Sequence, residues 1–254
     1  DVNLQILRSD GGLSSAQMAM DVPVNLLMSG PAGGVSGALW IAKNAGFGNL
    51  LTFDMGGTST DVALIEGGVA RTRREPRVAD VTVRAPSIDV RTVGVAGGSV
   101  PRVKRGRLSD VGPRSAHIAG LDYEAFTPDL GEVELTTIRP RPSDPDDYIA
   151  LRRGAGEATH ALTPTGASNL LGLTEGYGRG DAESIRSAFA AAGRFLGTSA
   201  EAVAKRMLEL AAARVAPVVK RLLSEHDARA DEFVMVGGGG GAEAVVPFTA
   251  KSLG

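Results

Sequence analysis

The sequence of 254 residues contains no cysteine and only three histidines. The absence of cysteine excludes disulfide bonds, thiolate metal sites and a cysteine nucleophile, and three scattered histidines argue against a metal site built from imidazole ligands. No apolar run approaches the ~18 residues that a membrane-spanning helix needs, and the first residues do not have a signal-peptide profile. The net charge of −2 provides no basic field for nucleic acids or anionic membranes. We therefore expect a cytoplasmic protein with no nucleic-acid or membrane partner.

Glycine, in contrast, is abundant, with 34 residues that gather largely in four clusters. The most informative cluster is Asp54-Met55-Gly56-Gly57-Thr58-Ser59-Thr60-Asp61. Apolar segments at 49–53 and 62–65 flank it, and both have the length of buried strands. The cluster therefore predicts the tight turn of a β-hairpin, with a further strand at 69–72.

The chemistry of this turn indicates a phosphate-and-magnesium site. Glycines at 56 and 57 allow a ligand to approach the backbone and let amide N–H groups form an anion-binding concavity. The hydroxyl groups of Thr58, Ser59 and Thr60 add hydrogen-bond donors, and the two flanking aspartates could hold a hydrated divalent cation or orient an attacking water. The alternative is a surface hairpin in which the same residues only satisfy turn geometry.

Two further clusters adjoin expected helices. Ser29-Gly30-Pro31-Ala32-Gly33-Gly34-Val35 leads into a helix that ends near Gly46, and its glycines indicate a close approach to ligand phosphate or to a packed strand. Gly237–Gly241 lies between a strand at 232–236 and a helix at 243–251. It lacks the second strand and acidic residue of a dinucleotide-binding fingerprint, and the sequence has no P-loop motif. The glycines could instead lie against a nucleobase or ribose, or form a close strand–helix crossing.

The rest of the sequence predicts short strands followed by long helices. We expect strands across 78–110, a loop over the proline-rich segment 126–146, and a hairpin formed by 148–153 and 159–163. Capping patterns predict helices over 181–195 and 200–224, and His226 beyond the second helix is expected to be solvated. Both termini of the sequence indicate a piece of a longer polypeptide.

The hairpin turn, followed far downstream by a strand, a glycine loop and a helix, resembles the second half of an actin/Hsp70/sugar-kinase-type ATPase. That resemblance implies an α/β, ribonuclease H-like lobe with a mixed sheet and flanking helices. In finer detail the sequence is similar to the hydantoinase A/oxoprolinase family, which includes N-methylhydantoinase, 5-oxoprolinase and the acetone and acetophenone carboxylase subunits. The motifs that carry this resemblance are 29–35, 54–62, Gly97-Gly98-Ser99, Val111-Gly112-Pro113-Arg114-Ser115-Ala116 and Gly237-Gly238-Gly239-Gly240.

The family resemblance implies that residues 1–254 form a hydantoinase A-type ATPase domain with a hairpin and loop insertion around 100–165. It implies an ATP- and magnesium-dependent hydrolase of cyclic amides or imides, in which ATP phosphorylates an unreactive carbonyl or enolate oxygen before hydrolysis. Asp54 would hold magnesium through water, and Asp61 would orient the hairpin or a water. The implied nucleotide contacts are Gly56, Gly57, Thr58, Ser59 and Thr60 for phosphate, Gly237, Gly238, Gly239 and Gly240 for adenosine, and Ser29, Gly33 and Gly34 lining the same cleft.

The resemblance also implies partners and leaves alternatives open. The expected partners are an N-terminal lobe that carries the other phosphate hairpin and a hydantoinase B-like subunit, so the isolated chain should be inactive. One alternative is an ATP-dependent ketone carboxylase subunit. Another is a non-catalytic scaffold, because the family often has Thr-Asp-Ala-Asn where this chain has Thr165-Gly166-Ala167-Ser168. His117, near Arg114, could touch substrate or be structural.

Overall fold

A computed structural model of the protein describes residues 4–78 and 81–253. The chain folds into two compact units, and each is assembled from separated segments of the sequence. Unit 1 comprises the described residues of 1–54, 61–92 and 219–238. Unit 2 comprises those of 55–60, 93–218 and 239–254. The chain therefore passes from one unit to the other within several of its elements.

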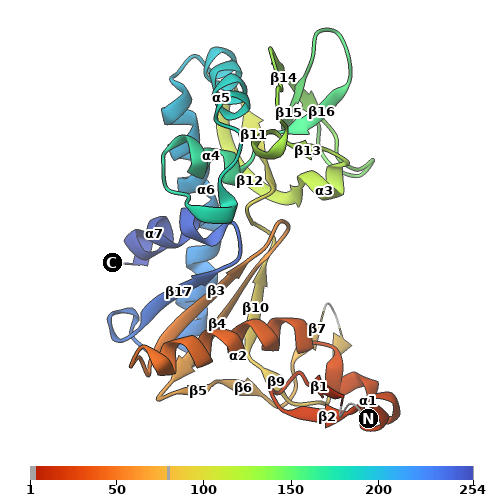
Figure 1. The fold of residues 1–254 in the computed structure, drawn as a ribbon, viewed down its shortest axis with the longest axis vertical. Coiled ribbons are helices and arrows are strands. Elements are labelled where there is room, and N and C mark those ends of the chain that lie inside the picture. The colour runs from red at the N-terminus through yellow and green to blue at the C-terminus, as the bar shows by residue number, and fades with distance from the viewer. Residues whose placement is uncertain (1–3, 79–80, 254) are drawn as a thin grey trace. The chain divides into compact units, whose positions relative to one another are not determined.

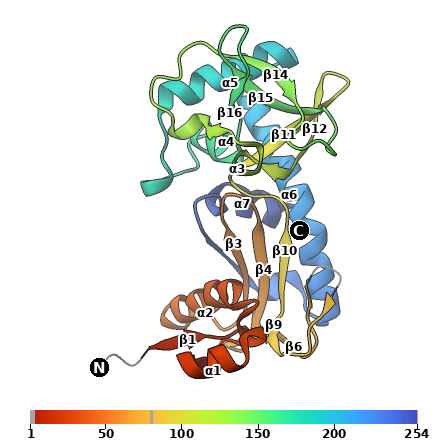
Figure 2. The same cartoon turned by 90° about the vertical axis from the view of Figure 1, so that its right-hand side faces the viewer.

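The centre of unit 1 is a sheet in the order β10–β4–β3–β17, in which β10, β4 and β3 lie side by side (Figure 2). Its strands are β3 (Leu50–Met55), β4 (Thr60–Glu66), β10 (Val90–Val93) and β17 (Val234–Gly238). The short β5 (Val69–Ala70) pairs antiparallel with β4. β17 runs parallel to β3 in a register that places Gly238 opposite Asp54. Thus β3, which leads into the glycine hairpin, lies beside β17, which ends in the distant cluster Gly237–Gly241.

Helix α2 (Ser29–Asn44) lies along one face of this sheet (Figure 1). Its buried side chains Ala32, Val35 and Ala42 pack in one core cluster with strand residues that include Leu50 and Ile65. Burial of each Val, Leu or Ile side chain contributes about 1.5–3 kcal/mol to the free energy of folding. Such packing offsets the helix propensity lost at the four glycines of α2, which cost ~1 kcal/mol each relative to alanine.

Shorter elements surround the sheet of unit 1. β1 (Gln5–Leu7) and β2 (Leu13–Ser15) form an antiparallel hairpin, followed by α1 (Ala16–Asp21), which Ser15 caps. The remaining pairs are antiparallel, β6 (Thr72–Arg73) with β9 (Ser87–Ile88) and β7 (Arg77–Val78) with β8 (Val81–Thr82). Single 3₁₀ turns are formed by Pro23–Leu26 and Ala230–Glu232.

Unit 2 contains a second mixed sheet in the order β12–β11–β15–β16–β13, with β14 also pairing with β15. Its strands are β11 (Ser99–Lys104), β12 (Arg107–Ser115), β13 (Asp122–Tyr123), β14 (Glu134–Ile138), β15 (Tyr148–Arg152) and β16 (Ala158–Ala161). The helices of unit 2 are α3 (Ala116–Ala119), α4 (Pro164–Leu170), α5 (Ala182–Leu196), α7 (Ala242–Leu253) and the greater part of α6 (Ala200–Glu225). The 3₁₀ turns are Glu124–Phe126 and Gly176–Gly178.

The helix boundaries in unit 2 follow the capping chemistry that the sequence predicts. The Asp181 side chain accepts a hydrogen bond from the Ser184 N–H at the start of α5, and Ser199 Oγ accepts one from the Ala202 N–H in the first turn of α6. Such caps satisfy N–H groups that have no partner within the helix, which is why both helices begin where the pattern indicates.

The structure confirms the α/β class and most predicted elements, including the hairpin at 148–163 and the strand–glycine–helix sequence near the C-terminus. The prediction of a loop throughout 126–146 is wrong, because β14 occupies Glu134–Ile138 and pairs with β15 along its whole length. The prolines flank this strand at 128 and 140 and do not interrupt it, and its Leu-Thr-Thr-Ile core favours a strand. Among residues 4–78 and 81–253, no helix is long and apolar enough to cross a membrane.

Candidate functional site

The predicted glycine turn joins β3 to β4 as a tight hairpin. The Gly56 N–H donates to the Ser59 carbonyl oxygen over 3.2 Å and closes the turn. Thr60 is fully buried and its hydroxyl donates to the Val95 carbonyl oxygen at 2.6 Å, whereas the Thr58 hydroxyl lies 3.1 Å from the Ser115 hydroxyl. Thr60 therefore stabilises the hairpin, and the assignment of these residues to a phosphate site remains a prediction.

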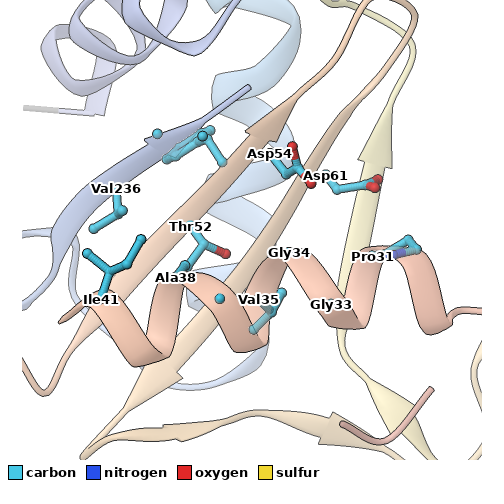
Figure 3. A pocket seen from close by; sticks show the side chains of 14 residues that line it. Pro31, Gly33, Gly34, Val35, Ala38, Ile41, Thr52, Asp54, Asp61 and Val236 are labelled. Carbon is cyan, nitrogen blue, oxygen red and sulfur yellow. The ribbon is translucent and has the colours of Figure 1, made fainter. Parts of the chain in front are cut away.

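A cavity of about 270 Å³ in unit 1 brings six of the predicted site residues together (Figure 3). They come from α2 and from the ends of β3, β4 and β17, and they are Gly33, Gly34, Asp54, Asp61, Gly237 and Gly238. Apolar side chains, among them Val35, Ile41 and Val236, also line the cavity. Ser29 begins α2 but is not among the described residues that line the cavity.

Asp54 reaches toward α2 at the position of Gly34. A Cβ atom on Gly34 would lie 2.6 Å from Asp54 Oδ2, so a side chain at this position would displace the carboxylate. This contact decides between the two explanations of the α2 glycines in favour of close packing at Gly34. Close packing also favours glycine at position 33, since a Cβ atom there would lie 3.2 Å from a methyl group of Leu7.

The electrostatics of the cavity depend on its two carboxylates. Burial raises the pKa of Asp61, and the negative charge of Asp54 raises it further. A hydrogen bond of 2.6 Å from the Thr92 hydroxyl to Asp61 Oδ1 acts in the opposite direction. A cation near the two carboxylates would relieve their repulsion.

Magnesium suits this donor set. Mg²⁺ binds through one or two carboxylates and keeps several waters or phosphate oxygens, so it does not require a cage of protein ligands. Among the described residues no group of three or more histidines and carboxylates is arranged to hold a metal ion. The pair Asp54 and Asp61 thus fits a hydrated ion and not a closed structural site.

In unit 2 the hairpin turn meets Gly97 and Gly98, a contact between distant segments that no local sequence pattern predicts. The N–H groups of Gly97 and Gly98 donate to the carbonyl oxygens of Gly56 and Gly57, both over 3.1 Å. Gly241, after β17, packs on Gly97, where a Cβ on Gly241 would lie 2.9 Å from the Gly97 backbone. Three glycine segments therefore stack backbone against backbone, which side chains would prevent.

Two glycines in these segments, Gly56 and Gly240, are not required by close packing. Gly56 and Gly240 both lie outside the left-handed region of φ. Apart from the residues next to them in the chain, no described atom lies within 4 Å of the position that a Cβ on either glycine would occupy. Because neither the backbone conformation nor a neighbouring side chain demands glycine here, the open space beside them is available to a ligand.

The space beside Gly166 is filled by a carboxyl group from elsewhere in unit 2. A Cβ on Gly166 would overlap the Glu124 carboxyl, whose Cδ would be 2.9 Å away. Glu124 is fully buried and accepts hydrogen bonds from the Thr163 N–H and hydroxyl at 2.8 and 3.0 Å. Burial raises the pKa of Glu124 to about 8, against the effect of these hydrogen bonds. Residues 165–168 include no acidic residue, but the carboxyl group of Glu124 packs against this segment.

The two histidines considered from the sequence differ in their surroundings. His117 is exposed on α3, and its neighbour Arg114 is held by Asp144 through two hydrogen bonds of 2.8 and 2.7 Å. The expectation that His226 is solvated is wrong, because its Nε2 lies 3.0 Å from Oδ2 of the buried Asp89. The turn after α6 places the imidazole against Asp89 within unit 1, a contact between residues 137 positions apart.

Comparison with known proteins places these features in a family. The family model described as "Hydantoinase/oxoprolinase" matches residues 1–254. Caprolactamase subunit alpha of Pseudomonas jessenii is 30% identical over 248 residues, which cover 97% of this chain and 32% of the relative. The 5-oxoprolinase of Saccharomyces cerevisiae is 38% identical over 118 residues, 46% of this chain and 9% of that enzyme.

A solved structure of acetone carboxylase without nucleotide is similar in fold. It superposes with a TM-score of 0.70 at 23% identity and covers 99% of this chain and 32% of that one. The chain thus spans about a third of the caprolactamase subunit and a smaller part of the oxoprolinase.

Proposed function

The chain belongs to the hydantoinase/oxoprolinase family, and from this we propose that it is the nucleotide-binding part of an ATP-dependent enzyme that opens cyclic amides or imides. One observation carries the proposal most directly. The glycine hairpin is built with an aspartate on each flanking strand, and both aspartates line one cavity with Gly237 and Gly238. Relatives that share this family are named as a caprolactamase and a 5-oxoprolinase, whose substrates are cyclic amides.

We assign the roles of individual residues by their chemistry. Asp54 would hold magnesium through water, and Asp61, held by Thr92, would orient a water or the hairpin. The N–H groups of Gly57 and Thr58 would bind phosphate oxygens, while that of Gly56 is already bonded within the turn. When bound, ATP would supply a phosphoryl group that converts a poor electrophile into a reactive one.

The glycine loop after β17 is proposed to receive the adenosine. Gly237 and Gly238 line the cavity of unit 1, and Gly240 has open space where a side chain would stand. Bases and sugars can lie flat on such a backbone because no Cβ atom holds them away. We propose that further polypeptide of the whole protein and a second subunit complete the enzyme, since the caprolactamase relative is itself a subunit.

The test measures ATP hydrolysis by the whole protein in the presence of magnesium and a cyclic imide, a lactam or a ketone. We expect hydrolysis that depends on a cyclic amide or imide, and Asp54→Asn is expected to lower kcat by about 100-fold, as loss of a charge-stabilising contact does. Asp231→Asn serves as the control, because Asp231 is exposed and forms an ion pair with the exposed Arg229.

Three results would each correct a different part of this proposal. Absence of ATP hydrolysis with every substrate would exclude the enzyme and favour a scaffold. Turnover that requires a ketone and bicarbonate would identify a carboxylase. Unchanged turnover in Asp54→Asn would refute the magnesium assignment while leaving the activity intact.

A further inference from the structure

Tyr123 is held in a fixed position by β13 and the core of unit 2. β13 pairs in parallel with β16, and the register places Tyr123 opposite Ala161. The ring packs against Phe126 with the two ring centroids 5.8 Å apart, and against the core cluster that contains Val100 and Leu121. A half-buried ring with contacts on these sides has little freedom to move its hydroxyl group.

The hydroxyl group of Tyr123 lies directly against the glycine hairpin. A Cβ atom on Gly57 would stand 2.8 Å from this hydroxyl, and one on Gly98 would overlap it and come within 2.5 Å of the ring carbon that carries it. Gly98 is the residue whose N–H donates to the Gly57 carbonyl oxygen. The phenol thus occupies the space that both glycines leave open, at the second glycine of the turn.

Filling space alone does not explain why this side chain has a hydroxyl group. The hydroxyl oxygen of Tyr123 is not among the described buried polar atoms that lack a partner, so a molecule from outside the chain can reach it. Among residues 4–78 and 81–253, none forms a hydrogen bond with the Tyr123 hydroxyl. Burial and the neighbouring Glu124 raise the pKa of Tyr123, so that the group remains a donor at neutral pH. A donor that has no partner in the described part of the chain, and that lies against the second glycine of the turn, suits an acceptor that comes from outside the chain.

We propose that Tyr123 donates its hydroxyl hydrogen to an oxygen of the phosphoryl group that binds at the Gly56–Thr58 turn. The inference rests on the proposed function, because the turn is itself assigned to phosphate there. Tyr123 adds a side-chain donor to the backbone donors, and it acts on charge that is present in the bound phosphate and in the transferring group alike. No bond is made or broken at the tyrosine.

The first test compares Tyr123→Phe with the control Tyr177→Phe in the whole protein. Phenylalanine keeps the ring and its packing, and Tyr177 is a fully exposed tyrosine on the turn Gly176–Gly178. We expect Tyr123→Phe to lower kcat/KM for ATP hydrolysis by about 10- to 100-fold, the usual effect of removing one donor to a charged group that is present in both the bound and the transferring phosphate. Tyr177→Phe should match the wild type, and equal rates in both variants would overturn the proposal.

The second test measures binding and does not depend on turnover. Calorimetric titration with inorganic phosphate and magnesium should give a dissociation constant about 10-fold weaker in Tyr123→Phe than in Tyr177→Phe. Titration with the cyclic amide alone should give the same dissociation constant for both variants. A weakened affinity for the amide with unchanged affinity for phosphate would overturn the proposal and assign the hydroxyl to the substrate. If the wild type hydrolyses no ATP, the proposed function fails, and the phosphate titration still decides the role of Tyr123.

Discussion

At the scale of single residues, five glycines of this chain fall into two kinds according to what lies beside them. Gly34, Gly98 and Gly166 each face a side chain that a Cβ atom would strike, namely Asp54, Tyr123 and Glu124. Gly56 and Gly240 face open space. The first kind is required by packing, and the second is where a ligand could approach the backbone. The sequence shows only that glycine is present, because the atoms that distinguish the two kinds come from distant segments.

Glu124 provides a pH-dependent contribution to stability. Its pKa of about 8 in the folded state lies above the value of 4.5 for an unperturbed carboxyl group, so the folded protein holds the proton more tightly than the unfolded chain. The favourable contribution is therefore complete below about pH 4.5. It is lost as the pH rises toward 8, by at most ~1.4 kcal/mol per pH unit.

We predict that Glu124→Gln removes this dependence, because the amide imitates the protonated acid toward Thr163. Urea unfolding between pH 5 and pH 8 should show the variant gaining stability relative to the wild type as the pH increases. Glu134→Gln is the control, since the Glu134 side chain is exposed on β14. If the free energies of unfolding of the wild type and of Glu124→Gln changed in parallel with pH, Glu124 would be ionised in the folded protein.

At the scale of elements, a buried aspartate joins the end of α6 to the strands of unit 1. Asp89, between β9 and β10, is 2% exposed and contacts Arg73, Arg91 and His226. The two arginines also contact Glu225 in the last turn of α6. These bonds oppose the cost of burial and hold the pKa of the Asp89 carboxyl below its usual value. The network thus connects elements that lie more than 130 residues apart in sequence.

We predict that Asp89→Asn lowers the free energy of unfolding by about 3 kcal/mol, because buried charges then lose their partner. Equilibrium unfolding in urea at pH 7 measures the change. Asp231→Asn breaks an ion pair in the same unit whose side chains are 73% and 61% exposed, and it should alter stability by less than ~1 kcal/mol. A similar small loss for both variants would mean that the Asp89 network does not hold α6 in place.

At the scale of the whole molecule, the chain spans about a third of the caprolactamase subunit that it resembles. We predict that the 254-residue chain by itself hydrolyses ATP at least ~100-fold more slowly than the whole protein, because a second set of phosphate donors would be absent. Phosphate release assays on both proteins, at equal molar concentration and with the same cyclic amide, measure the difference. Equal turnover numbers would show that these residues contain a complete active site.

Local sequence signals were sufficient for most of the fold and for the family. Alternation and apolar runs identified β3, β4, β15, β16 and β17, and capping residues identified α5 and α6, because these patterns depend on neighbours within a few residues. The prediction of a loop around β14 was wrong because the prolines only flank the strand, which pairs with β15 along its whole length. The family resemblance rested on motifs whose order and spacing can be read directly along the chain.

Contacts between distant segments were decided only by the tertiary structure. The sequence by itself determined an α/β protein with a glycine hairpin between two aspartates. The tertiary structure decided that these aspartates share a cavity with Gly237 and Gly238, that Glu124 fills the space beside Gly166, and that Tyr123 reaches the hairpin. The physical reason is that such contacts are formed by side chains that packing brings together across 42 to 184 positions, over which no local pattern is preserved.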